Sequence, residues 1–482
     1  MITRRAMLKL AGMAPLAGAA PLVGRRSEAL QGECADLTLR IGTGLVELAP
    51  DHIVSTTLYN GEFPGPVIRF KEGRRTTIDL VNDTDTPEQV HWHGQNLPSD
   101  VDGAAEEGTP YVPARGARRI GIVPGPAGFR FVHTHVAAGN NLSQGTYSGQ
   151  AAAVYIEPAH DPGAYDREVF LVLKEFGASF SRGGDMAMDV LPGQPLAALR
   201  AMGKHADDRF TGPKGYEVGY DLFSINGRML GHGEPIRVKR GERVLFHVLN
   251  ASATEIRSLA LPGHHFHVIA LDGNPAPTPA NVPVLWLGTA ERISAVVTMN
   301  QPGIWVMGDL SDDDRGHGMG IVVEYAGHRG RPVWRKPPPF RWDYTRFARA
   351  SGARTTPDET IEVTVAKENG AIGGFNRWTL NGEAFSMDTM KPTYTVHQGR
   401  RYRLKFRNAS DDLHPLHLHR HTFEVTRIGG KATAGVMKDV VMMGGFQEVE
   451  FDFVADNPGL TLFHCHQQLH MDFGFMALFT YA

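Results

Sequence analysis

The stretch that decides the fold is GLTLFHCHQQLH, residues 459–470, because shorter versions of its first half occur twice earlier in the chain. Those versions are GFRFVHTH at residues 128–135 and GIWVMGDL at residues 303–310. Each begins with a glycine and continues with alternating apolar positions, the pattern of a half-buried β-strand. A strand that recurs three times along one chain predicts three copies of one domain.

A second recurring block precedes each of these strands. It starts at an Asn-Gly pair, continues as a strand, a glycine turn and another strand, and ends at an asparagine. The pairs lie at residues 60–61, 226–227 and 381–382, and the closing residues are Asn82, Asn250 and Asn408. Repeated strand–turn–strand units of this kind are typical of β-sandwich domains.

Length and composition agree with this interpretation. At 482 residues the chain is too long for one hydrophobic core, and three domains are expected. Its 55 glycines and 31 prolines favour many short strands over long helices. We therefore expect an all-β protein with domains at residues 35–160, 161–330 and 359–482, a linker at 331–358 and a surface insertion at 181–215.

Charge and cysteine content exclude two classes of protein. A formal net charge of -3 and a pI near 6.7 leave no basic surface, so nucleic acid is not an expected partner. The two cysteines, Cys34 and Cys465, are too few for a disulfide scaffold. Because only Cys465 stands between two histidines, unrelated roles are expected for the two.

The N-terminal segment, residues 1–34, has the pattern of an export signal. An arginine pair at 4–5 precedes a short apolar stretch, Leu10–Gly24, as in substrates of the twin-arginine export machinery. The alternative is a membrane anchor, for which the stretch is short. Cleavage is compatible with the bonds after Ala20 and Ala29. We expect a periplasmic or extracellular protein.

Four pairs of histidines occupy the repeated strands of the first and third copies. Residues i and i+2 of a strand project from the same face, so each pair presents two imidazoles to one side. A core would not gather eight such rings, because each dry unpaired nitrogen costs about 1–3 kcal/mol. Neutral imidazole suits copper, so one shared copper pocket is predicted. The eight residues are His91, His93, His133, His135, His417, His419, His464 and His466. The matching positions of the middle copy are Leu259, Leu261, Gly308 and Leu310.

Cys465 points to the opposite face of its strand from His464 and His466. It can therefore bind a separate copper, together with His414 and His470. One thiolate and two imidazoles in a trigonal array are the blue-copper ligand set. The backbone that joins Cys465 to its neighbouring histidines is then a short covalent route for electrons between two copper sites.

Together these motifs resemble those of the three-domain multicopper oxidases, the family of laccases, ascorbate oxidase, bilirubin oxidase and bacterial cuprous oxidases. The resemblance extends from Leu37 to the end of the chain, and the joint occurrence of all four motifs is far more specific than any one of them. It implies three tandem cupredoxin-like Greek-key β-sandwich domains. It also implies four copper ions, one of type 1, one of type 2 and two of type 3.

The resemblance further implies how the ligands are divided. By motif position, type 1 copper takes His414, Cys465 and His470, and type 2 copper takes His91 and His417. The type 3 pair takes the remaining six, His93, His133, His135, His419, His464 and His466. Cys465 and His470 are then the residues that carry substrate electrons, and dioxygen is expected to bind between the first and third domains.

Phe475 stands where members of the family carry a Met, Leu or Phe axial to type 1 copper. Because Phe cannot bind copper, a three-coordinate site with a raised potential is expected, and Met476, one position late, is interpreted as core packing. Asp102 is the predicted proton-relay acid, since similar enzymes carry an acid there and the reduction of dioxygen consumes protons. A second acid that some relatives carry after the last histidine is not matched, because Met471 follows His470 and Asp472 comes one residue later.

The resemblance implies a laccase-like enzyme that takes electrons from phenols or aromatic amines, through an exposed edge of His470, and passes them to O2. The alternative is an oxidase of Cu(I), Fe(II) or Mn(II), often marked by Met-rich segments. The methionines here are scattered, at Met186, Met188, Met202, Met442 and Met443. A non-enzymatic relative that has lost its copper ligands is disfavoured, because this chain keeps all of them. Three-domain members are usually monomers, so a monomer is expected.

Overall fold

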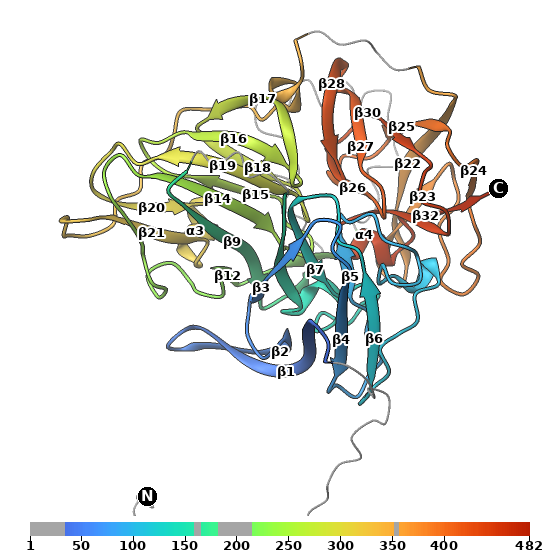
Figure 1. Ribbon diagram of the computed structural model, residues 1–482, viewed down its shortest axis with the longest axis horizontal. Coiled ribbons are helices and arrows are strands. Elements are labelled where there is room, and N and C mark those ends of the chain that lie inside the picture. Colours follow the sequence, from blue (N-terminus) through green and yellow to red (C-terminus); the bar gives the residue numbers. More distant parts are fainter. Residues whose placement is uncertain (1–33, 159–164, 182–214, 351–355) are drawn as a thin grey trace, which may run out of the picture.

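The computed structural model describes residues 34–158, 165–181, 215–350 and 356–482. Nearly all regular structure in these residues is β-strand, arranged as three consecutive sandwich domains, so the predicted fold class is confirmed (Figure 1). Residues 1–33 of the predicted export segment and most of the predicted insertion lie outside the described residues. Among the described helices, none has the length and apolar character needed to cross a membrane.

The first domain packs two four-stranded sheets, ordered β2-β1-β4-β6 and β3-β8-β7-β5. Its strands are β1 (Leu37–Ala49), β2 (His52–Tyr59), β3 (Gly65–Lys71), β4 (Thr76–Asn82), β5 (His91–His93), β6 (Ala117–Ile122), β7 (Gly128–His133) and β8 (Ala151–Glu157). Two short 3-10 helices, η1 (Ala105–Glu107) and η2 (Gly145–Tyr147), lie in its loops.

The middle domain packs a six-stranded sheet, β12-β9-β14-β19-β16-β17, on a five-stranded sheet, β13-β21-β20-β15-β18, beside the small sheet β10-β11. Its elements are β9 (Arg167–Phe176), β10 (Ser179–Ser181), β11 (Glu217–Gly219), β12 (Leu222–Ile225), β13 (Ile236–Val238), β14 (Arg243–Asn250), β15 (Arg257–Ala260), β16 (Phe266–Leu271), β17 (Asn274–Val282), β18 (Val284–Leu287), β19 (Arg292–Thr298), β20 (Ile304–Gly308), α3 (Asp312–Gly316) and β21 (Gly320–Tyr325).

The third domain repeats this plan with the sheets β23-β22-β25-β30-β27-β28 and β24-β32-β31-β26-β29. The 3-10 helix η5 (Tyr344–Phe347) precedes it. Its elements are β22 (Glu359–Ile372), β23 (Phe375–Leu380), β24 (Tyr394–Val396), β25 (Arg401–Asn408), β26 (His414–Leu418), β27 (Phe423–Ile428), β28 (Lys431–Lys438), β29 (Val440–Met443), β30 (Glu448–Val454), β31 (Thr461–Cys465), α4 (Gln468–Asp472) and β32 (Met476–Tyr481).

The Asn-Gly pairs that reveal the repeat form the same turn in all three domains. Asn60, Asn226 and Asn381 have φ angles of 52°, 54° and 54°, and the glycine after each is also left-handed. Two successive positive φ angles are characteristic of the type I′ hairpin turn, for which Asn-Gly is preferred. Each asparagine Oδ1 accepts a backbone hydrogen bond from a neighbouring strand. The donors are the N–H groups of Arg40, Val172 and Thr364.

The closing asparagines hold buried loops in place. Asn250 is fully buried; its Nδ2 donates to the carbonyls of Glu255 and Leu287, and its Oδ1 accepts from the N–H of Ser252. Asn82 and Asn408 make the equivalent three bonds in their own domains. The sequence repeat therefore marks positions where one side chain satisfies three buried backbone groups.

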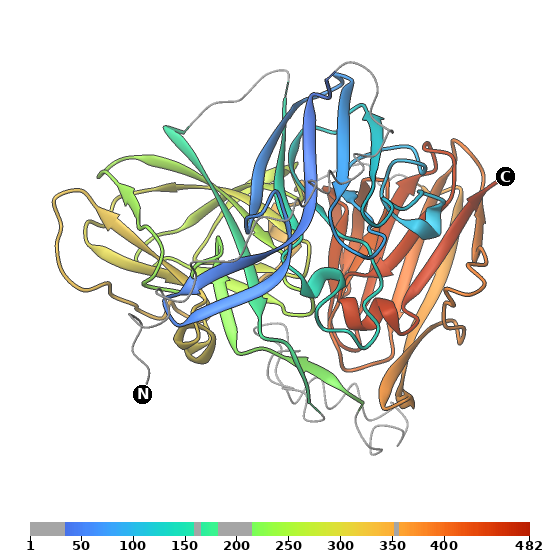
Figure 2. The ribbon, with the colours of Figure 1, turned by 90° about the horizontal axis from the view of Figure 1, so that it is seen from below.

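The first and third domains lie side by side, and the middle domain packs against both (Figures 1 and 2). Strand β7 contacts β19, strand β17 contacts β28, and η1 of the first domain contacts β31 of the third. The ends of β5, β7, β26 and β31 are thereby brought to one boundary.

We predict that Asn250→Ala leaves three buried backbone groups without partners and lowers the free energy of unfolding by at least about 1–3 kcal/mol. Chemical denaturation of the copper-free protein measures the change. The exposed Asn300 provides the control, Asn300→Ala, which should alter stability by no more than about 0.5 kcal/mol. Equal effects of the two substitutions would contradict this role for Asn250.

Candidate metal centre

Two pairs of neighbouring strands bring the histidine pairs together. Strand β5 is antiparallel to β7, with His91 opposite His133, and β26 is antiparallel to β31, with His417 opposite His464. The first pair of strands belongs to the first domain and the second to the third. None of the eight paired histidines is more than 5% exposed. All eight rings therefore lie in the interior, at or just beyond the ends of these strands.

The eight rings form three groups in which the nitrogen atoms available as ligands lie within 4.8 Å of one another. The groups are His91 with His93 and His417, His93 with His133 and His466, and His135 with His419 and His464. Every group combines residues of the first domain with residues of the third. The pocket therefore exists only where the two domains meet.

Burial favours the neutral form of seven of these rings, and several ring nitrogens have no partner within the protein. Burial, followed by the effect of neighbouring imidazoles, holds the pKa of most of them well below the usual value, and the pKa of His419 falls to about 4. The Nε2 atoms of His91 and His417 and both ring nitrogens of His466 are buried without a hydrogen-bond partner. Such unpaired nitrogens are costly unless a ligand satisfies them, so the groups fit metal ions.

A second centre lies around Cys465, which is fully buried at the end of β31. Its Sγ atom lies 3.6 Å from Nδ1 of His414 and 3.5 Å from Nδ1 of His470, and the two Nδ1 atoms are 3.2 Å apart. Desolvation raises the pKa of the thiol and lowers that of both rings, that of His470 to about 3. One sulfur and two imidazole nitrogens facing one another match the blue-copper ligand set.

Comparison with known proteins gives the same assignment. Family models described as multicopper oxidase match residues 43–161, 200–325 and 354–482, one in each domain. The chain belongs to the multicopper oxidases. It is therefore an enzyme of an oxygen-reducing family, and copper is the metal typical of its buried histidine groups.

Similar proteins cover nearly all of this oxidase. Multicopper oxidase MmcO of Mycobacterium tuberculosis is 29% identical over 429 residues, which are 87% of this chain and 81% of MmcO. Laccase-3 of Thanatephorus cucumeris is 25% identical over 553 residues, with 94% and 92% covered. The crystal structure of Fet3p, a multicopper oxidase that functions in iron import, has a TM-score of 0.73 at 16% identity, covering 92% of this chain and 90% of Fet3p.

The oxidase orients four of its site histidines through backbone carbonyls. The Nδ1 atoms of His91, His133, His417 and His464 lie 2.7–3.0 Å from the carbonyl oxygens of Asp102, Thr134, Asp439 and Cys465. A carbonyl can only accept, so Nδ1 is the donor in each case and Nε2 is left for copper.

Asp102, the predicted relay acid, is fully buried between two of these histidines. Its Oδ2 lies 3.1 Å from Nδ1 of His91 and 3.0 Å from Nδ1 of His419. These two rings belong to different histidine groups, and they come from different domains. Asp102 can therefore accept a hydrogen bond from the ring of each of these two histidines.

Phe475, which precedes β32, and Met476, the first residue of β32, pack in different hydrophobic clusters. The Phe475 ring is fully buried with its centroid 4.8 Å from that of His414, beside the Cys465 centre. Met476 belongs instead to a hydrophobic cluster with Leu462 and Leu478, which agrees with its interpretation as core packing.

Trp378 is a site residue that sequence reasoning missed. Its ring on β23 packs 4.7 Å from the His414 ring and 4.3 Å from the His470 ring, between centroids. A lone tryptophan in a strand has the pattern of an ordinary core residue, so no sequence signal marked it. His470 itself is only 3% exposed, so the expectation that its ring edge is open to substrate is wrong.

Asp439 was also missed. Its Oδ1 lies 3.1 Å from Nε2 of His93, and its two oxygens each accept a bond of 2.6 Å from Arg292, while Arg130 donates at 3.2 Å. Arg130, Arg292 and Asp439 come from the first, middle and third domains, and all three are buried. Their contact depends on domain docking, which no local pattern reports.

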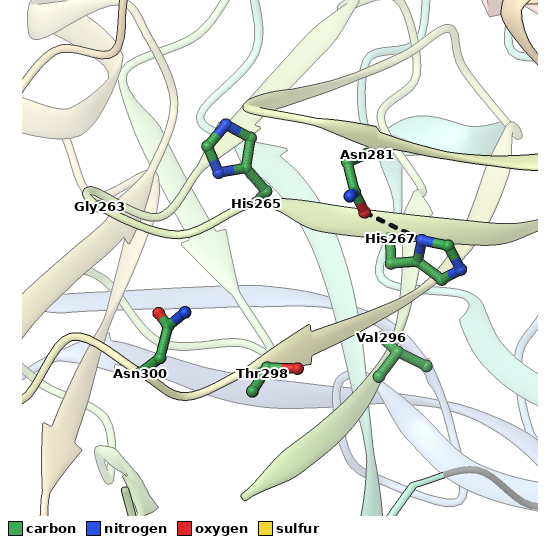
Figure 3. Close-up of a pocket in the computed structure, with 7 residues that line it drawn as sticks. All are labelled: Gly263, His265, His267, Asn281, Val296, Thr298 and Asn300. Atoms are coloured by element: carbon green, nitrogen blue, oxygen red, sulfur yellow. Dashed lines mark hydrogen bonds between the residues drawn. The ribbon is translucent and has the colours of Figure 1, made fainter. Parts of the chain in front are cut away.

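Four described histidines of the middle and third domains lie outside the two centres. His264 and His421 lie within hydrogen-bond distance of the hydroxyls of Tyr325 and Tyr481. His265 and His267 line a surface pocket of the middle domain, where His267 bonds Asn281 and the two rings point in different directions (Figure 3). These four are therefore ordinary strand or surface histidines, outside the two centres.

We predict that Asp439→Asn lowers the free energy of unfolding of the copper-free oxidase by about 3–5 kcal/mol, because it removes the carboxylate that two buried guanidinium groups share. Denaturant unfolding measures the change. The matched control is Asp83→Asn, which breaks an ion pair to Arg40 at the surface and should cost no more than about 1 kcal/mol. A loss for Asp439→Asn no greater than for the control would show that the buried contact is not important for stability.

Proposed function

We propose that this multicopper oxidase removes single electrons from phenols or aromatic amines and reduces O2 to water, as laccases do. The observation that carries the proposal is the position of Cys465. It faces His414 and His470, while its chain neighbours His464 and His466 belong to two different groups of the other centre. One peptide link on either side therefore joins the site of electron entry to the site of dioxygen reduction.

The proposed oxidase holds four copper ions. His414, Cys465 and His470 would hold type 1 copper, and His91 and His417 would hold type 2 copper. When bound, copper accepts one electron at a time at the first site and supplies the multi-electron reduction of O2 at the cluster. The type 3 pair would use the other six histidines, His93, His133, His135, His419, His464 and His466.

The chain itself orients the histidine rings, excludes bulk water from them and provides a path for protons. Buried carbonyls fix the histidine tautomers, and the burial of the rings excludes bulk water from the groups. Reduction of O2 to water requires protons, and Asp102 is the carboxylate that contacts both His91 and His419. We propose that protons pass to the cluster by way of Asp102, whose Oδ1 atom is buried without a hydrogen-bond partner while Oδ2 faces the two rings.

Substrate electrons would enter the Cys465 centre by way of the Trp378 ring, which packs against it. Trp378 packs on both His414 and His470, so a donor outside the protein need not touch either ring. This arrangement favours outer-sphere transfer from organic reductants, in agreement with the similarity to Laccase-3.

A metal-ion substrate is the second candidate, because Fet3p, whose structure is similar, is a multicopper oxidase that functions in iron import. Met442 and Met443 do not favour it, since both are fully buried and offer no thioether to a metal ion from outside. Met186, Met188 and Met202 lie outside the described residues. The organic-substrate proposal therefore stands first.

The proposal also covers the export, the location and the oligomeric state of the protein. We propose that residues 1–34 direct the protein through the twin-arginine export machinery, and that it acts as a monomer in the periplasm or outside the cell. Supporting this are the arginine pair and the apolar stretch that follows it. Co-migration of the mature oxidase with periplasmic markers, lost after Arg4→Lys and Arg5→Lys, tests the route.

The substrate class is tested by O2 uptake with a phenol, Cu(I) and Fe(II) in one copper-loaded preparation. We expect kcat/KM for the phenol to exceed that for either ion. Autoxidation of each reductant is subtracted with heat-inactivated protein. A higher kcat/KM for a metal ion would reverse the order of the two candidates.

We predict that Cys465→Ser abolishes the blue colour and the oxidation of substrate, because the thiolate is lost, while the three histidine groups still bind copper. Absorption spectra and metal analysis measure both effects. The second cysteine offers the matched control: Cys34 is exposed and belongs to neither centre, so Cys34→Ser should keep colour and activity. Blue colour in Cys465→Ser would refute the assignment.

A further inference from the structure

The short helix η1 carries two adjacent glutamates, Glu106 and Glu107, which are only 4% and 3% exposed. Charged side chains are rarely so buried unless they have partners. Neither glutamate belongs to a recognised ligand motif. Both nevertheless face the group formed by His135, His419 and His464.

The position of η1 is set by the backbone. Gly103 has a φ of 104°, and a Cβ atom there would lie 1.9 Å from the carbonyl oxygen of Val90. Only glycine permits this close approach of the chain to β5. The segment that follows Asp102 is thereby held against the histidine groups.

Glu107 ties this segment to the third domain. Its Oε1 accepts a hydrogen bond of 2.7 Å from the N–H of Leu462 on β31 and lies 3.6 Å from Nδ1 of His419. Glu107 thus has a structural partner of its own.

Glu106 has no such partner. Its Oε2 atom lies 3.7 Å from Nδ1 of His135, and each of these two buried atoms lacks any hydrogen-bond partner. The other ring nitrogen of His135, Nε2, lies 3.5 Å from Nε2 of His464. His135 therefore directs Nε2 into its group and Nδ1 toward the glutamate.

The other two members of the group already have acceptors for Nδ1. That of His419 lies 3.0 Å from Asp102 Oδ2, and that of His464 lies 2.9 Å from the carbonyl oxygen of Cys465. Metal-binding histidines almost always donate their second N–H to a carboxylate or carbonyl, which fixes the tautomer and the ring orientation. His135 lacks only this bond.

We propose that Glu106 is the positioning residue that accepts the Nδ1–H bond of His135 and so holds its Nε2 atom toward type 3 copper. This inference rests on the proposed copper assignment. A separation of 3.7 Å is longer than a hydrogen bond, and bonds in ligand-free sites commonly tighten on binding.

Asp472, the nearest match to the acid missing after His470, is used elsewhere. Its Oδ2 accepts bonds of 3.0 and 2.8 Å from the N–H groups of Ala138 and Gly139, and its Oδ1 accepts from Nε2 of Gln468. Asp472 therefore fixes a loop and has no bond to a histidine. Glu106 of the first domain therefore provides a carboxylate beside the histidine group, whereas the residues after His470 provide none.

The test compares Glu106→Ala, Glu106→Gln and Asp472→Asn with the unaltered protein by titrating copper against a competing chelator. Blue colour and near-ultraviolet absorption report the two centres separately. We expect Glu106→Ala to bind copper at the histidine cluster about 10–100-fold more weakly, with the blue colour unchanged. Glu106→Gln should restore most of the affinity, because its amide oxygen can still accept from Nδ1–H. Asp472→Asn should leave cluster affinity unchanged.

The outcomes are distinguishable. Wild-type affinity in Glu106→Ala, or equal losses in folded Glu106→Ala and Glu106→Gln, would overturn the inference, as would an equal loss in Asp472→Asn. Absence of copper from the histidine groups of the unaltered protein would instead overturn the proposed function.

Discussion

The structure depends on one constraint: the imidazole rings buried at the boundary between domains must each find a hydrogen-bond acceptor inside the protein. Ten histidines and one cysteine lose their hydration together, and each ring keeps an N–H donor that must be satisfied. Backbone carbonyls serve four rings, and the carboxylates of Asp102 and Asp439 serve others. Much of the surrounding architecture consists of acceptors placed for these donors.

The middle domain has none of these histidines, yet it contributes to the same boundary. Its Arg292 binds Asp439 through two hydrogen bonds, and Asp439 in turn contacts His93. Arg130 of the first domain completes the contact. Since a buried charge is tolerated only when it is paired, the docking of all three domains and the orientation of one histidine depend on the same ion cluster.

Much of the fold and the centre could be predicted because both rest on local geometry. The Asn-Gly turns at Asn60, Asn226 and Asn381 require left-handed φ angles that this dipeptide readily adopts, so the repeat was visible in the sequence. Alternation along a strand likewise separates Cys465 from His464 and His466. The burial of His470 was mispredicted, because exposure depends on which distant side chains cover a ring.

The sequence alone determined the three sandwich domains and the sorting of eleven side chains into two centres, since period-two alternation and turn chemistry act between near neighbours. Only the tertiary structure decided which acids and aromatic rings surround those centres. Glu106, Trp378 and Asp439 have ordinary local sequence and acquire their contacts through docking between elements far apart in the chain. Burial and hydrogen-bond pairing are properties of that docked interface, and no single segment carries them.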